Sequence, residues 1–222
     1  MEENTEIQES NIVKAYGMKW IVVFSMFLFL SCTSKEQKVP YYFSPDISPT
    51  WDLTGYTGER HTIGAFTFLN QNDEIYNSDS LANRIYLANF FFTSCPSICP
   101  TMTQNLTKIQ DKYLAENIRL VSFSVTPNID SVARLKEYHE AKGLKSNWNL
   151  LTGSQSKIYA LSRNSFFVEE EIGLSKDSSD FLHTERCVLV DKKGYIRGVY
   201  NATLPLDVNR MIEDIDILLA ED

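Results

Sequence analysis

The sequence predicts a single α/β domain in which a central mixed sheet is flanked by helices. Two nearly continuous apolar runs, at 84–92 and 118–125, are typical of central strands that are covered on both faces. A helical pattern follows each run, and the later segment 184–203 has the pattern of an antiparallel hairpin. The chain has 222 residues, of which 43% are hydrophobic and 23% charged, and these values fit one domain with a buried core.

The first half of the domain supplies a hairpin, the two central strands and two helices. Residues 61–76 combine an apolar alternation, a polar turn and a short return, which predicts a hairpin. We expect one helix at 101–115 and a second that is capped by Asp130 and runs to about Lys142. The aromatic stretch 41–51 contains two prolines and is more typical of a segment lying against the fold than of a helix.

The second half continues the alternation and ends in a hairpin and a helix. In chain order, the expected elements are a strand at 148–153, a helix at 154–163, a strand of an inserted hairpin at 165–171, the hairpin 184–203 turning at Asp191–Gly194, and a closing helix at 206–220. Two strand–helix units followed by an antiparallel hairpin and a final helix match the order of a thioredoxin-like fold.

Composition excludes several classes of function. The net charge of −8 and the isoelectric point near 5.0 argue against a nucleic-acid-binding surface, which requires a basic face. We find no glycine-rich phosphate loop in the sequence. Four cysteines are too few for a disulfide-stapled scaffold, so each cysteine has to be interpreted separately.

The first cysteine belongs to a segment with the features of a secretory signal. Residues 18–32 read "MKWIVVFSMFLFLSC", in which a lysine precedes an apolar run that ends shortly before Cys32. The run is shorter than the 18 or so residues expected of a membrane-spanning helix, so a transmembrane segment is the less favoured interpretation. The ending "FLSC" resembles a bacterial lipoprotein signal, in which the cysteine is lipidated.

This interpretation divides the chain into three parts. We expect residues 1–31 to be an N-terminal extension and signal peptide, residues 32–40 a lipidated tether, and residues 41–222 the folded domain. The domain would then lie outside the cytoplasm in a bacterial cell envelope, anchored to the membrane through the lipid on Cys32.

The stretch "FFFTSCPSICPTMTQNL" at 90–106 holds Cys95 and Cys99, four positions apart, after a predicted strand. If this turn is helical, the spacing puts both sulfurs on one face. The pair could close into a disulfide, or two thiolates could hold one soft ion such as Cu(I) or zinc. A second cysteine pair of this kind is missing from the sequence, which excludes a Cys₄ site, so a metal would need a further ligand, most plausibly a histidine.

Three histidines and one more cysteine are candidates for that ligand. His183 precedes the strand that contains Cys187, and in a thioredoxin-like order this loop packs beside the cysteine loop. His61 and His139 are expected to be surface residues. Cys187 is expected to be a buried, inert apolar residue, since its position in the strand is too far from His183 for both to bind one ion.

Several segments resemble the SCO/SenC family, whose members are thioredoxin-fold copper proteins that assist assembly of cytochrome c oxidase. The cysteine stretch is very similar to the copper motif of that family. Three later blocks resemble family blocks in the same order, namely "VSFSVTPNIDSVARLKEY", "WNLLTG" and "HTERCVLVDKKGYIRGVY". The sequence departs from the family pattern at Thr126 and Leu182, where family members often carry aspartates.

The resemblance implies that Cys95, Cys99 and His183 bind one copper ion, as Cu(I), which is compatible with two thiolates and one imidazole. It further implies that the protein either delivers copper to the dicopper site of the oxidase's copper-bearing subunit or reduces the cysteines of that site. Other copper chaperones or thiol reductants are expected as further partners, and nucleic acid is not.

Two other functions remain open from the residues. The chain could be an extracytoplasmic thiol–disulfide oxidoreductase that uses Cys95 and Cys99 as a redox pair without metal. A peroxidase that uses Cys95 as its nucleophile is less favoured, because such chemistry relies on an activating arginine and the stretch 90–106 contains none.

Overall fold

A computed structural model describes residues 38–116, 118–168 and 184–221 of the chain. Its elements are β1 (Tyr41–Tyr42), β2 (Pro49–Thr50), β3 (Thr67–Asn70), β4 (Ile75–Asn77), η1 (Ser78–Leu81), β5 (Ile85–Phe91), α2 (Ile98–Lys112), β6 (Ile118–Ser124), α3 (Val132–Ala141), β7 (Trp148–Thr152), α4 (Gln155–Asn164), β8 (Arg186–Val190), β9 (Ile196–Asn201) and α5 (Pro205–Ala220). The strands form one sheet in the order β2-β1-β9-β8-β5-β6-β7-β3-β4.

The sheet is mixed, as the sequence predicts. Strands β5, β6 and β7 are parallel neighbours, whereas β8 runs antiparallel to β5 and β9 antiparallel to β8. The β8–β9 hairpin forms where expected, because the carboxylate of Asp191 accepts the amides of Lys193 and Tyr195 and Gly194 adopts a φ of +83°. The carboxyl ends of β5 and β6 therefore lie at the same edge of the sheet as the start of β8 and the end of β9.

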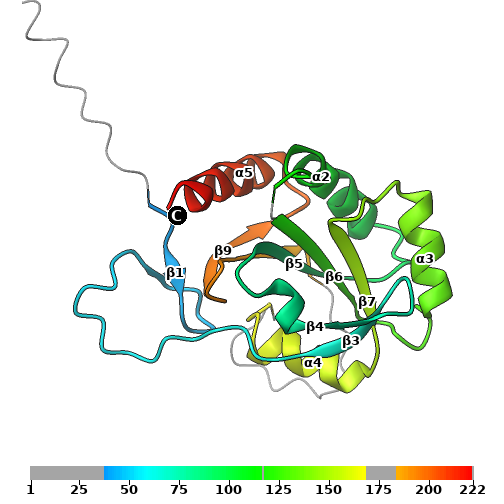
Figure 1. The fold of residues 1–222 in the computed structure, drawn as a ribbon, viewed down its shortest axis with the longest axis horizontal. Coiled ribbons are helices and arrows are strands. Elements are labelled where there is room, and N and C mark those ends of the chain that lie inside the picture. Colours follow the sequence, from blue (N-terminus) through cyan, green and yellow to red (C-terminus); the bar gives the residue numbers. More distant parts are fainter. Residues whose placement is uncertain (1–37, 117, 169–183, 222) are drawn as a thin grey trace, which may run out of the picture. The chain divides into compact units, whose positions relative to one another are not determined.

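Both faces of the central strand β5 are covered by helices. Ile85, Leu87 and Phe91 enter one apolar cluster together with residues of α2, α3 and α5, whereas Tyr86 and Phe90 enter a second cluster with residues of α4. Figure 1 shows α2 and α5 together on one side of the strands and α4 on the other. This two-sided burial explains why the sequence of β5 is apolar throughout and does not alternate.

Strands β1 and β2 are additions to the sheet that the sequence analysis missed. They form a short hairpin in which Tyr41 pairs with Thr50, and Tyr42 joins the sheet opposite Ile196 of β9. Each strand has only two residues, and Pro49 in β2 cannot donate a ladder hydrogen bond. A pattern this short gives no periodicity that sequence analysis can detect.

Two other boundaries correct the sequence analysis. Helix α2 begins at Ile98 and ends at Lys112, three residues earlier at each end than predicted. Ser131, not Asp130, caps α3, since the Ser131 hydroxyl accepts the amide of Arg134. In the inserted hairpin expected at 165–171, residues 165–168 form no strand, and the rest lies outside the described residues.

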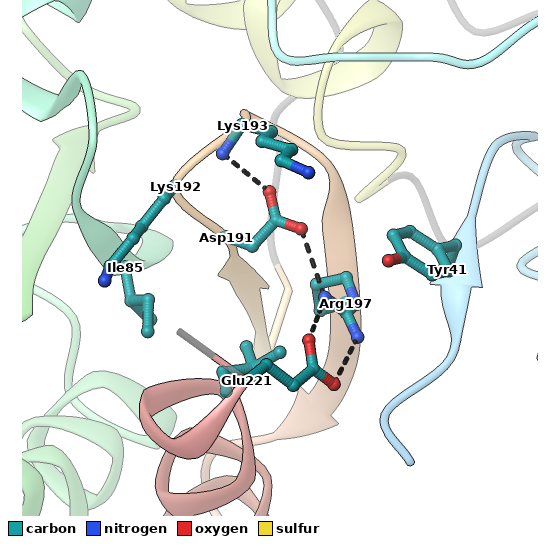
Figure 2. Close-up of a pocket in the computed structure, with 8 residues that line it drawn as sticks. Tyr41, Ile85, Asp191, Lys192, Lys193, Arg197 and Glu221 are labelled. Atoms are coloured by element: carbon teal, nitrogen blue, oxygen red, sulfur yellow. Dashed lines mark hydrogen bonds and ion pairs between the residues drawn. The ribbon is translucent and has the colours of Figure 1, made fainter.

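A buried arginine joins several segments near the first residues of β5. Arg197 donates hydrogen bonds to the backbone carbonyls of Val39 and Pro40, pairs with the carboxylates of Asp191 and Glu221, and lies 4.1 Å from the centre of the Tyr41 ring. Figure 2 shows Tyr41, Asp191, Arg197 and Glu221 around a small pocket of about 100 Å³. Val39 and Pro40, which the sequence analysis assigned to the tether, are therefore buried in the fold.

Within residues 38–116, 118–168 and 184–221, the helices are too short or too polar to cross a membrane.

Candidate metal centre

The two cysteines of the motif lie between the end of β5 and the first turn of α2. Cys95 lies in the connecting turn, where its amide donates to the carbonyl of Phe92 at 3.3 Å. Cys99 is the second residue of α2. The sequence analysis put both sulfurs on one face only if this turn is helical. The helix begins at Ile98, so Cys95 precedes it.

The sulfur of Cys95 nevertheless meets the start of this helix. The backbone amide of Cys99 donates to Cys95 Sγ at an N···S distance of 3.4 Å, and Ser97 Oγ lies 4.0 Å from the same sulfur. Ser97 occupies the N-cap position of α2 but makes no capping hydrogen bond with its side chain. The Cys95 thiol thus takes the position of a capping acceptor at the positive end of the helix.

This placement makes the two thiols chemically different. Burial raises the pKa of the Cys95 thiol, but hydrogen bonds from the backbone of Cys99 and Ser97 outweigh it and hold the pKa below its ordinary value. Burial raises the pKa of the Cys99 thiol to about 12, and the neighbouring Cys95 contributes to that increase. Near neutral pH, Cys95 is the better thiolate and Cys99 retains its proton.

Both thiols are largely covered by protein. Cys95 is 6% exposed and Cys99 3% exposed, and both belong to the apolar cluster beneath α2. The ring of Tyr138 from α3 packs 5.5 Å from the ring of Phe91, and its hydroxyl lies 3.0 Å from Thr103 Oγ1 of α2. Burial raises the pKa of Tyr138, and the hydrogen bond with Thr103 opposes that rise.

An arginine reaches the cysteine loop from a helix distant in the sequence. Arg134 Nε of α3 donates to Thr93 Oγ1 at 2.6 Å, and Thr93 lies two residues before Cys95. The sequence analysis considered only residues 90–106 and found no arginine there. The structure supplies one, although its hydrogen bond goes to the threonine hydroxyl and not to a thiol. The 41-residue separation left no signal in the sequence.

The predicted third ligand, His183, lies outside the described residues. The described chain begins again at Thr184. Cys187 of β8 pairs with Asn89 near the end of β5, so the start of β8 lies at the edge of the sheet that carries the cysteine loop. Thr184 is buried and 3% exposed. The described chain therefore returns to this edge one residue after His183.

The other two histidines are not at the cysteine loop. His61 Nε2 lies 2.8 Å from the carbonyl oxygen of Ser165, and the centre of the His61 ring lies 4.3 Å from that of the Phe167 ring, with the two planes tilted by 38°. His139 Nε2 lies 3.2 Å from the carbonyl oxygen of Trp148. Both side chains are half-buried, and not on the open surface as the sequence analysis predicted.

The remaining cysteines have separate positions. Cys187 is fully buried, as predicted, and burial raises the pKa of its thiol. Cys95, Cys99 and Cys187 are free thiols.

The predicted lipidation site, Cys32, lies outside the described residues. Among the residues that the structure describes, no three histidine, cysteine or acidic side chains converge on a common metal position, so two thiols are the part of the site that can be placed.

Comparisons with known proteins point to one family. A family model described as SCO1/SenC matches residues 54–220. The crystal structure of a SCO1/SenC family lipoprotein from Bacillus anthracis is 29% identical, with a TM-score of 0.63 over 72% of this chain and 96% of that chain. BsSco, described as a member of the Sco family of cytochrome c oxidase assembly proteins, is 32% identical, with a TM-score of 0.60 over 73% and 96% of the two chains.

A third solved structure supports the fold alone. ScoI from Arabidopsis thaliana, with copper bound, is 22% identical to this chain. Its TM-score is 0.58 over 72% of this chain and 98% of that chain.

Proposed function

Because the chain belongs to the SCO1/SenC family, we propose that it binds one copper ion through Cys95, Cys99 and His183 and serves in the assembly of cytochrome c oxidase. The observation that supports this most directly is the contact of 3.4 Å between the Cys99 amide and Cys95 Sγ, which places the Cys95 sulfur against the first turn of the helix that carries Cys99. Two thiolates form a soft donor pair, which suits Cu(I).

The third ligand is supported by the course of the chain. Thr184, which directly follows His183 in the sequence, is buried and lies at the edge of the sheet that carries the cysteine loop. A neutral imidazole completes a low-coordinate site with two thiolates. Leu182, where family members often carry an aspartate, leaves this imidazole without the adjacent carboxylate that commonly orients a ligand histidine.

Protonation and oxidation of the thiols control the binding of copper. Each sulfur binds the ion as a thiolate. The ion therefore has to displace the proton of Cys99, whose pKa is about 12. An oxidised Cys95–Cys99 pair has no thiolate left to bind copper. Occupancy by the metal and the redox state of the pair are therefore linked.

The proposed partner is the copper-bearing subunit of cytochrome c oxidase, to which the protein delivers its copper as cargo. This extends the description of BsSco to the present chain. Lipidation of Cys32 would place the domain on the outer side of a bacterial membrane, which the description of the Bacillus anthracis relative as a lipoprotein supports. Residues 1–31 would then be removed as an extension and signal peptide.

A second role, the reduction of the partner's cysteines, is favoured by the difference between the two thiols. The Cys95 thiolate would attack a disulfide sulfur of the partner, forming a mixed disulfide and releasing one partner thiolate. Cys99 would then lose its proton and attack Cys95 Sγ, forming the Cys95–Cys99 disulfide and releasing the second partner thiol. Two electrons pass from this chain to the partner.

An anaerobic Cu(I) titration of the reduced full chain in detergent, against a competing chelator, tests the proposed site. We expect one copper per chain, with tight binding lost in Cys95→Ala, Cys99→Ala and His183→Ala and retained in the control Cys187→Ala. Copper binding that is unchanged in His183→Ala would remove this residue from the site.

A second experiment distinguishes delivery from reduction. The copper-loaded chain and the copper-free reduced chain are each mixed with the oxidase subunit, whose cysteines are either reduced or disulfide-bonded. Delivery predicts metal transfer to the reduced subunit, whereas reduction predicts loss of the subunit's disulfide without metal. If neither reaction occurs, the proposed partner is wrong.

A further inference from the structure

Asp130 carries a buried carboxylate beside the cysteine loop. The sequence analysis assigned this residue to the cap of α3, but Ser131 takes that role and the carboxylate turns into the protein. The side chain of Asp130 is 0% exposed. A carboxylate this deeply buried persists only if hydrogen-bond donors surround it.

Hydroxyl and amide groups from two segments provide these donors. Thr93 donates twice, through its amide to Oδ2 at 3.1 Å and through its hydroxyl to Oδ1 at 2.5 Å. The hydroxyls of Ser124 and Thr126 donate to Oδ2 at 2.6 Å and 3.2 Å. Thr126, which replaces an aspartate common in the family, thus serves as a donor to Asp130.

Arg134 connects the same groups from the side of α3. Its Nε donates to Thr93 Oγ1 at 2.6 Å and lies 3.7 Å from Asp130 Oδ1, one turn earlier in the chain. The Thr93 hydroxyl therefore accepts from the guanidinium while it donates to the carboxylate. Both interactions fix the orientation of Thr93.

The fixed orientation of Thr93 limits the conformation of the cysteine loop. Thr93 follows Phe92, whose carbonyl accepts the amide of Cys95, and it is separated from Cys95 by one residue. The remaining contacts of Asp130 reach rigid parts of the sheet: Ser124 ends β6, and Thr152, the last residue of β7, donates its hydroxyl to the Asp130 carbonyl at 2.8 Å. The cysteine loop is thereby tied to the ends of two neighbouring strands.

We propose that Asp130 is a positioning residue for the Cys95–Cys99 pair. Through Thr93 and Arg134, it holds the loop in the conformation in which Cys95 Sγ accepts the Cys99 amide. This inference rests on the proposed function only in taking that pair as the working site. Loss of the anchor should release the loop, weaken the bond between amide and sulfur, and shift the pair toward its disulfide.

The test measures the equilibrium of the copper-free pair with glutathione in the full chain, together with the unfolding temperature. We expect Asp130→Asn and Thr93→Val to shift the equilibrium toward the disulfide by roughly tenfold, because each removes charge-assisted hydrogen bonds. Thr93→Ser keeps the hydroxyl and should restore the parent value. Cu(I) affinity should fall in the same two variants and recover in Thr93→Ser.

Thr152→Val is the matched structural control. It removes a hydrogen bond to the backbone of Asp130 and leaves the contacts of the carboxylate in place. It should lower the unfolding temperature without moving the glutathione equilibrium. If Thr93→Val lowers the unfolding temperature as Thr152→Val does and leaves the equilibrium at the parent value, Asp130 is only structural.

The glutathione readout also separates this inference from the proposed function. A parent chain that fails to bind Cu(I) would contradict the copper function. A shifted equilibrium in Thr93→Val would in that case still support Asp130 as the positioning residue for the thiol pair.

Discussion

Two buried charges near opposite ends of β5 are stabilised in different ways. Arg197, near the first residues of β5, meets two carboxylates, two backbone carbonyls and an aromatic ring. Asp130, beyond the carboxyl ends of β5 and β6, meets mostly uncharged hydroxyl groups, and its contacts lead to a loop with two thiols.

The difference indicates which end is built for stability and which for chemistry. The Arg197 cluster joins β9, the β8–β9 turn, the end of α5 and the segment before β1, so its contacts connect parts of the fold and do not reach the cysteine loop. The Asp130 cluster ends at Thr93, where the chain leaves the sheet. Loops at the carboxyl ends of parallel strands are frequent positions of functional sites in α/β folds. Variants at each end should therefore separate stability from thiol chemistry.

The largest expected effect is the loss of copper binding in Cys99→Ser. Because one of two thiolate ligands is removed, we expect Cu(I) affinity to fall by more than about 100-fold, beyond the range seen when only a group supporting a ligand is lost. The unfolding temperature should change little. Competition with a Cu(I) chelator measures the affinity, and near-parent affinity would contradict the proposed site.

Arg197→Met should have the opposite profile. Removing the guanidinium leaves the buried carboxylate of Asp191 without its partner, and we expect a loss of about 3 kcal/mol in the free energy of unfolding. The glutathione equilibrium of the thiols should not move. Denaturant unfolding measures the loss. Arg210→Met is the control, since that exposed pair with Asp207 should contribute less than about 1 kcal/mol.

Copper affinity should rise with pH. The Cys99 thiol keeps its proton up to a pKa of about 12, so binding of copper releases this proton at every lower pH. The Cys99 proton alone should therefore increase the apparent affinity by about tenfold per pH unit across the neutral range. Chelator competition at pH 6, 7 and 8 tests the slope, and an affinity independent of pH would contradict it.

The smallest expected effect is a difference in alkylation rates within the reduced chain. Cys95, with its lowered pKa, should react with iodoacetamide at least about tenfold faster than Cys99 at neutral pH. The fully buried Cys187 should react only on unfolding. Mass spectrometry of timed samples measures the order of labelling. If Cys99 is labelled first, the proposed asymmetry of the pair is wrong.

The sequence alone predicted the central strands, the β8–β9 hairpin and the thioredoxin-like order. Long apolar runs and a turn with Asp191 and Gly194 are local signals. An apolar run without alternation is stable as a strand only where both faces of the sheet are covered, so these signals predict the central strands directly. The sequence also singled out Cys95 and Cys99 as one site, because both lie in one short motif. The roles of His183 and Cys32 stay predictions, since both lie outside the described residues.

Tertiary structure decided how the two thiols differ and what holds their loop. The structure shows which amide meets the Cys95 sulfur, namely that of Cys99, and this contact helps to separate the pKa values of the two thiols. Asp130 carries a local capping pattern, yet its carboxylate turned inward because Ser131 capped α3 and donors 37 residues away in sequence were available. Contacts of this kind depend on which strand ends meet, and no local pattern in a chain encodes that.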